Sequence, residues 1–234
     1  MGIRRPSRRE IDMNRVLETI QNIRVVPVVA MQDAGDAGRL AQALIDGNLP
    51  CVEVTFRTAA AEDSMRALAQ RGDILVGAGT VLTVDQVKRA LNAGAQFIVS
   101  PGMHAKVVQY CLEHDITVTP GICTPSDIML ALDFGLSVVK FFPAEAFGGL
   151  NTLKALGAPF TTVKFIPTGG ISPRNLTEYL AYPQVFACGG TWIAASELLA
   201  SGRFDDIARL AREAVEIAAK VDKKTSVRPT GPLP

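Results

Sequence analysis

From about Arg24 to Lys220 the chain alternates between two kinds of segment, and this alternation limits its fold more than any other feature. A short run rich in β-branched residues ends in Gly, Pro or Thr, and a segment rich in Ala and Leu with helical periodicity follows it. The runs are VVPVVA, CVEVTF, ILVGAG, FIVSPG, TVTPG, VVKFFP, KFIPTGG and VFACGG. Nearly continuous apolar strands separated by helices indicate a parallel sheet with helices on its faces.

The number of repeats distinguishes between the parallel architectures. Eight strand-and-helix units in 234 residues favour the α/β class, as a single (β/α)8 TIM barrel, over an open doubly wound sheet. No strand leads through a GxGxxG loop into a helix, so nothing indicates a dinucleotide fold. We expect the barrel over residues 14–220, a flexible basic extension over 1–13 and a disordered tail over 221–234.

Composition excludes several classes of partner. A formal net charge of +1 and a charged fraction of 20% give no single-sign field that would attract nucleic acid or an anionic membrane. Charged residues or glycines interrupt every apolar run before it reaches the roughly 20 residues needed to cross a bilayer. We therefore expect a soluble protein in which any anion binding is local.

Metal-ligating residues are scarce in this chain. His104 and His114 are the only histidines, and two histidines could not make a His-rich site, so we expect no metal. The cysteines form no CxxC pair, which excludes a zinc ribbon or a dithiol redox motif. We expect reduced thiols in a cytoplasmic protein. The four cysteines are Cys51, Cys111, Cys123 and Cys188.

The stretch VVKFFPAE places a lysine, Lys140, in the middle of a run that otherwise reads as a buried strand. The alternative is a lysine whose stem lies along apolar surface while its ammonium group reaches water. The alternation of side chains, however, puts Lys140 on the same face as Val138 and Phe142, toward the barrel interior. Because burial disfavours the cation, such a lysine would be a neutral, nucleophilic amine. We expect Lys140 to form a Schiff base.

The run CVEVTFRT carries two charged residues on one predicted face, Glu53 and Arg57. One hypothesis is a structural salt bridge between these two side chains. The other is a general acid/base at Glu53, whose protonated form burial would favour. In that case the forked guanidinium of Arg57 and the hydroxyl of Thr80 are suited to bind a substrate carboxylate.

Two Gly-Gly pairs follow the last two predicted strands, Gly169 with Gly170 and Gly189 with Gly190. Glycine lets backbone N–H groups approach an anion closely, and the loops after strands seven and eight of such barrels often hold a phosphate. The alternative is that each pair only permits a tight turn. Both pairs together, with the Thr191 hydroxyl beside them, favour a phosphate site.

Taken in order and spacing, the motifs EVTFRT, GAGTVL, FIVSPG, KFFPAEAFGG, PTGGIS and GGTW resemble those of the bacterial 2-keto-3-deoxy-6-phosphogluconate (KDPG) and 4-hydroxy-2-oxoglutarate aldolase family. The resemblance covers nearly the whole chain apart from its two tails. It implies a metal-free class I aldolase of the Entner–Doudoroff pathway, usually a homotrimer, that cleaves KDPG to pyruvate and glyceraldehyde 3-phosphate. 4-Hydroxy-2-oxoglutarate is often a second substrate.

The resemblance also implies a role for each candidate residue. Lys140 would form the Schiff base, Glu53 would be the general acid/base, and Arg57 and Thr80 would bind the pyruvate carboxylate. The pyruvate pocket would be lined by Pro101 and Phe142, and the phosphate end would be held by Thr168, Gly169, Gly170, Gly190 and Thr191. Thr191 departs from the serine often found in the family but keeps a hydroxyl.

This chemistry needs no cofactor, because the protonated imine is itself the electron sink for breaking the C3–C4 bond. The nearest alternative is an aldolase with the same chemistry whose substrate is the galactonate epimer of KDPG. The two substrates differ at the C4 hydroxyl. A phosphosugar isomerase or epimerase normally asks for paired acid/base groups or a metal, which the shortage of histidine disfavours. A non-enzymatic phosphate-binding barrel would leave a buried Lys140 and Glu53 without a purpose.

Overall fold

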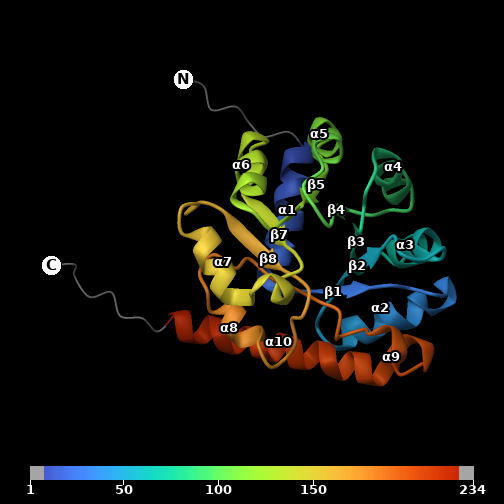
Figure 1. Cartoon of the computed structure of the whole chain (residues 1–234). Helices are drawn as coiled ribbons and strands as arrows, with labels where there is room; N and C mark the ends of the chain where they lie inside the picture. The colour runs from blue at the N-terminus through green and yellow to red at the C-terminus, as the bar shows by residue number, and fades with distance from the viewer. Residues whose placement is uncertain (1–7, 227–234) are drawn as a thin grey trace.

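The computed structural model describes residues 8–226 of the chain (Figure 1). The first helix, α1, begins at Arg8, and the last, α10, ends at Ser226. Helices therefore enter both the segment predicted as an extension, 1–13, and the segment predicted as a tail, 221–234. The rest of those two predictions, residues 1–7 and 227–234, lies outside the described residues.

All eight predicted runs are strands, and every strand pair is parallel. The strands form a six-stranded sheet in the order β5-β4-β3-β2-β1-β9 and a three-stranded sheet in the order β6-β7-β8. Their bounds are β1 Val25–Val29, β2 Cys51–Thr55, β3 Leu75–Gly79, β4 Phe97–Val99, β5 Thr117–Thr119, β6 Gly121–Ile122, β7 Val138–Phe141, β8 Lys164–Pro167 and β9 Cys188–Gly190.

Helices alternate with the strands and surround them (Figure 1). Helix α10 packs against α2, α8 and α9. The α-helices are α1 Arg8–Ile23, α2 Ala37–Asp46, α3 Ala61–Ala69, α4 Val84–Asn92, α5 Ala105–Glu113, α6 Pro125–Asp133, α7 Gly149–Gly157, α8 Leu176–Leu180, α9 Ser196–Ala200 and α10 Phe204–Ser226; the 3₁₀ turns are η1 Ala34–Asp36 and η2 Glu145–Phe147. Within residues 8–226, no helix is both long and apolar enough to cross a lipid bilayer.

The run TVTPG, predicted as one strand, is divided at Pro120 into β5 and β6. Proline has no N–H to donate to a ladder, so the pairing changes there. β5 pairs with β4, and β6 pairs with β7. At the other side of the small sheet, one isolated parallel bridge joins Thr168, just after β8, to Gly189 of β9. The predicted parallel α/β arrangement is confirmed, and its strands form two sheets.

Both faces of the strands are buried, which explains why their sequences are almost continuously apolar. One face packs beneath the helices in the larger core cluster. The other face forms a smaller cluster that includes Val26, Phe97 and Val138, together with Ile20 of α1. Because Val138 is the first residue of its strand, and Val26 and Phe97 lie near the start of theirs, α1 covers the amino ends of the strands.

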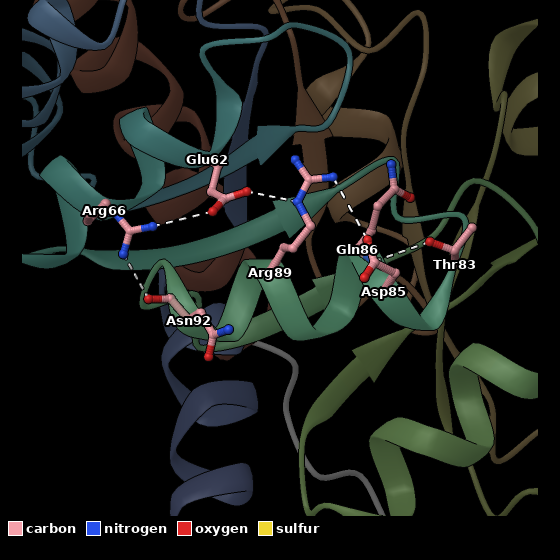
Figure 2. Close-up of polar contacts among 7 residues, drawn as sticks. All are labelled: Glu62, Arg66, Thr83, Asp85, Gln86, Arg89 and Asn92. Atoms are coloured by element: carbon pink, nitrogen blue, oxygen red, sulfur yellow. Dashed lines mark hydrogen bonds and ion pairs between the residues drawn. The ribbon is translucent and has the colours of Figure 1, made fainter.

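Polar side chains join neighbouring helices on the outer layer (Figure 2). Glu62 of α3 accepts hydrogen bonds from Arg66, at 3.3 Å, and from Arg89 of α4, at 2.9 Å. Arg66 also donates to the carbonyl of Asn92, at 3.0 Å. Exposed ion pairs of this kind contribute roughly 0–1 kcal/mol each. They link α3 to α4 and add little to the stability of the protein.

Candidate active site

Lys140 and Glu53 form an ion pair inside the sheet structure. Lys140 lies in β7 and is 6% exposed, and Glu53 lies in β2 and is 4% exposed. The Lys140 Nζ is 3.2 Å from the Glu53 Oε1, although the two residues are 87 positions apart in sequence. The Phe142 ring centroid lies 5.2 Å from the same Nζ. The predicted mid-strand, inward-facing location of Lys140 is confirmed, and its charge partner is a carboxylate.

Glycines make room for this pair. A Cβ added at Gly79 of β3 would lie 2.1 Å from the Glu53 Oε1, so any other residue there would displace the carboxylate. Gly77, on the same face of β3, makes room in the same way for the Phe97 ring. A small cavity adjoins the pair, and its remaining walls are Ile20, Val26, Phe97, Val99, Thr119, Ile166 and Gly189. The surroundings of the amine and carboxylate are therefore mainly apolar.

Glu53 pairs with Lys140 and not with Arg57, so the hypothesis of a structural Glu53–Arg57 salt bridge is wrong. The reason is local, because β2 ends at Thr55 and the alternation of faces does not continue to Arg57. Arg57 is exposed in the turn that follows, and within residues 8–226 its side chain makes no ion pair. It lies at the carboxyl end of β2, free to meet a ligand.

Three further predicted residues follow the carboxyl ends of their strands. Thr80 follows β3, Pro101 lies two residues after β4, and Phe142 follows β7. Thr80 has a φ of 55°, a left-handed conformation that is rare for a β-branched residue and costs about 1–3 kcal/mol. The Pro101 carbonyl lies so close to β6 that a Cβ at Gly121 would be 2.1 Å from it.

The loop after β8 contains two consecutive glycines whose backbone N–H groups are unbonded within the described residues. Gly169 and Gly170 have φ values of 97° and 83°, which favour glycine. Within residues 8–226, neither of their N–H groups donates a hydrogen bond to another residue of the chain. Thr168, which is buried, ties the turn to the sheet, because its N–H donates to the Phe141 carbonyl and its own carbonyl accepts from Ala144. Successive free N–H groups of this kind form an anion-binding concavity.

The end of β9 lies beside this turn, since Thr168 and Gly189 form a parallel bridge. A Cβ at Gly189 would be 2.2 Å from the Thr168 hydroxyl, and a Cβ at Gly190 would meet the Trp192 ring at 2.2 Å. Thr191 is exposed directly after the strand. The two Gly-Gly pairs are therefore neighbours at one edge, as predicted for the proposed phosphate end.

The two histidines contact helix α5, and the cysteines form no disulfide within residues 8–226. His104 caps the start of α5 by accepting from the Val107 N–H, and His114 stacks on Tyr110 at its end. Within residues 8–226, no three His, Cys, Asp or Glu residues form a group that could hold a metal ion. The four cysteines are free thiols, and burial raises the pKa of Cys111 to about 12.

Sequence reasoning missed Glu145 and Tyr179, which lie beside the glycine turn. The Tyr179 hydroxyl donates to the Glu145 Oε1 at 2.5 Å. Burial, and then this hydrogen bond, raise the pKa of the Tyr179 hydroxyl above its ordinary value. Glu145 belongs to the motif KFFPAEAFGG, but its place in the sequence carries no signal of a partner 34 residues away.

These features define a parallel α/β protein with a candidate lysine-centred site between its strands and a candidate glycine-rich anion cradle at their carboxyl ends. The chain belongs to the KDPG and KHG aldolase family, whose model matches residues 16–210. Aldolases are carbon–carbon lyases, so the chain is a lyase. The family assignment sets aside both the phosphosugar isomerase hypothesis and the non-enzymatic barrel hypothesis.

Individual relatives agree with the family. The 2-dehydro-3-deoxy-phosphogluconate aldolase of Treponema pallidum is 48% identical over 206 residues, which cover 88% of this chain and 98% of that protein. The KHG/KDPG aldolase of Escherichia coli K12 is 46% identical, covering 82% and 91%. A solved KDPG aldolase of Legionella pneumophila, with pyruvate captured as a covalent carbinolamine intermediate, has a TM-score of 0.82 and 36% identity, covering 85% of this chain and 97% of that one.

Proposed function

We propose that this chain is a class I aldolase that cleaves KDPG to pyruvate and glyceraldehyde 3-phosphate in the Entner–Doudoroff pathway, through a Schiff base on Lys140. The observation that carries the proposal is the buried amine of Lys140, 3.2 Å from the carboxylate of Glu53. An amine held away from water beside a proton acceptor has what imine formation needs. The carbinolamine captured in the Legionella relative supports the same chemistry.

In the proposed mechanism the Lys140 amine attacks the C2 ketone, and loss of water gives a protonated imine. Glu53 removes the proton of the C4 hydroxyl, the C3–C4 bond breaks, and its electron pair moves into the imine to give an enamine. Glyceraldehyde 3-phosphate leaves as the aldehyde. Glu53 then returns a proton to C3, and water hydrolyses the imine to release pyruvate and the free amine.

The substrate would lie across the carboxyl ends of the strands. Its carboxylate would bind the exposed guanidinium of Arg57 and the hydroxyl of Thr80, and Pro101 and Phe142 would enclose the pyruvate portion. Its phosphate would accept hydrogen bonds from the N–H groups of the glycine-rich loops, a preference that the two free N–H groups after β8 support. The residues proposed for the phosphate end are Thr168, Gly169, Gly170, Gly190 and Thr191.

A coupled assay tests this function. The purified protein should release pyruvate from KDPG, and from 4-hydroxy-2-oxoglutarate as a second substrate, at the same rate with and without EDTA. The galactonate epimer, assayed in parallel, measures the preference at C4. Loss of turnover in EDTA that added metal restores would contradict the metal-free mechanism. A faster rate with the epimer would make the chain a galactonate-specific aldolase.

The proposed site fits one closed (β/α)8 barrel, into which the two sheets would join. β5 and β6 are separated only by Pro120, and the Thr168–Gly189 bridge joins β8 to β9. Two backbone hydrogen bonds add to that side, from Phe165 to the Gln184 carbonyl and from Phe186 to the Phe165 carbonyl. These contacts would bring all the strand ends around one mouth.

We also propose that the enzyme is a cytoplasmic homotrimer. Its free thiols are typical of a reducing compartment. Helix α6 exposes three large apolar side chains, Met129, Leu130 and Leu132, and buries only Ile128 and Ala131. A cluster of large exposed apolar side chains normally marks an interaction surface, and a second copy of the chain would cover this one.

A further inference from the structure

Glu145 braces the glycine turn that follows β8. Its backbone N–H donates to the Gly169 carbonyl at 3.0 Å. Its side chain lies directly against the next residue, because a Cβ at Gly170 would be 2.5 Å from both the Cβ and the Cγ of Glu145. On the other side of the turn, the Asn175 side chain donates to the Gly170 carbonyl at 3.1 Å. The turn is thus held from both sides.

Glu145 in turn is held by Tyr179. The Tyr179 side chain is 1% exposed, and its hydroxyl donates to the Glu145 Oε1 at 2.5 Å. Gly149 leaves room for the contact, since a Cβ there would be 2.8 Å from the same Oε1 and 3.1 Å from the Tyr179 hydroxyl. Gly149 therefore leaves room for the carboxylate of Glu145, and Gly170 leaves room for its Cβ and Cγ.

The charge of Glu145 makes this orientation matter. A carboxylate beside free N–H groups competes with, and repels, an anion that those groups would bind. The hydrogen bond from Tyr179 directs the charged end of Glu145 toward α8, while its backbone and its Cβ and Cγ support the turn. A free Glu145 side chain could rotate toward the two N–H groups of the cradle.

We propose that Tyr179 and Glu145 are positioning residues for the phosphate end of the substrate. Glu145 shapes the turn at Gly169 and Gly170, and Tyr179 keeps its carboxylate away from the bound phosphate. Within residues 8–226, no hydrogen bond or ion pair joins either residue to Lys140 or Glu53, so neither is assigned a part in imine chemistry. The inference rests on the proposed function and names what determines affinity at one end of that site.

The test measures aldol condensation of pyruvate with two acceptors, glyceraldehyde 3-phosphate and unphosphorylated glyceraldehyde. Tyr179→Phe should raise KM for the phosphorylated aldehyde about tenfold, the scale of one hydrogen bond to a charged group. Its kcat, and its kcat/KM for the unphosphorylated aldehyde, should stay within about twofold of the wild type. Exchange of the pyruvate methyl protons should be unchanged.

A double variant separates charge from packing. Glu145→Gln keeps an acceptor for Tyr179 and removes the charge, so its KM for the phosphorylated aldehyde should remain near the wild-type value. Adding Glu145→Gln to Tyr179→Phe should restore most of the lost affinity, because the rotated side chain would no longer repel phosphate. A KM in the double variant as high as in Tyr179→Phe would overturn the charge argument.

Tyr182→Phe is the matched control. Tyr182 also donates to a side-chain oxygen at 2.5 Å, that of Gln184, but it lies near the amino end of β8, beside the Lys164–Pro183 hydrogen bond. It should leave both KM values unchanged, whatever it does to the melting temperature. Equal KM values for Tyr179→Phe and wild type would overturn the inference, while a wild-type enzyme without aldolase activity would overturn the proposed function instead.

Discussion

At the scale of single residues, the pairing of Lys140 with Glu53 gives each group a reason to be buried. Removing one partner of a buried ion pair leaves the other uncompensated, at a cost of about 3–5 kcal/mol. The pair also holds the proposed nucleophile 3.2 Å from the proposed proton acceptor. In the proposed mechanism stability and catalysis both depend on this contact, so experiments must separate the two effects.

Glu53→Gln should lower kcat by about 10²-fold or more, the usual effect of losing a general acid/base, while the folded variant still forms some pyruvate imine at Lys140. Exchange of the pyruvate methyl protons, with the melting temperature measured in parallel, checks the prediction. Normal methyl-proton exchange in a well-folded variant would remove Glu53 from the mechanism.

Arg57→Ala should act differently, because the Arg57 side chain is exposed and does not support Glu53. The loss of a charge-assisted hydrogen bond to the substrate carboxylate, about 1.5–3 kcal/mol, should appear mainly as a higher KM for KDPG. The melting temperature should change little. A large fall in melting temperature with unchanged KM would assign Arg57 to the fold instead.

At the scale of elements, β3 contributes no reactive group to the proposed site, but its glycines leave room for the residues that do. Its glycines at 77 and 79 lie on the face occupied by Phe97 and Glu53. The sequence GAG would be a weak strand by itself, since glycine loses more conformational freedom on folding than other residues. The space it leaves is what admits a buried carboxylate.

Gly79→Ala should therefore reduce activity through Glu53. The new Cβ would lie 2.1 Å from the carboxylate oxygen, so the carboxylate must move, and a shift of about 1 Å can cost about 10²-fold in kcat. Gly38→Ala in α2 is the control, because a Cβ there meets nothing within 4 Å and should stabilise the protein by about 0.5–1 kcal/mol. Full activity of a folded Gly79→Ala variant would show that Glu53 tolerates displacement.

Local sequence patterns predicted the strands but not the contacts between distant strands and helices. The alternation of strands and helices predicted every strand run, and the period of two placed Lys140 inward, because these are local patterns. The hypothesis that Glu53 pairs with Arg57 was wrong. The true partner, Lys140, lies 87 residues away on β7, and no local sequence pattern indicates so distant a contact. The contact between Glu145 and Tyr179 was missed for the same reason.

At the scale of the whole molecule, the exposed apolar face of α6 leads to a prediction about assembly. Met129 is 59% exposed, and Met129→Lys would place a charge in the proposed contact between copies, where desolvating it is costly. Sedimentation should show a trimer for the wild type and smaller species for the variant. Ala219→Lys, an exposed site on α10, should remain trimeric. A monomeric wild type, or a Met129→Lys trimer, would contradict this interface.

Trapping the imine with borohydride tests whether the enzyme works through a covalent bond to Lys140. Incubation with pyruvate and borohydride should add one reduced pyruvyl group per chain, and peptide mass spectrometry should locate it on Lys140. Lys164 is the internal control, because it opens β8 at the amino end, where its Nζ donates to the Pro183 carbonyl at 3.0 Å. An adduct on Lys140 that is absent from Lys140→Ala is the predicted result; an adduct on Lys164, or none at all, would contradict the mechanism.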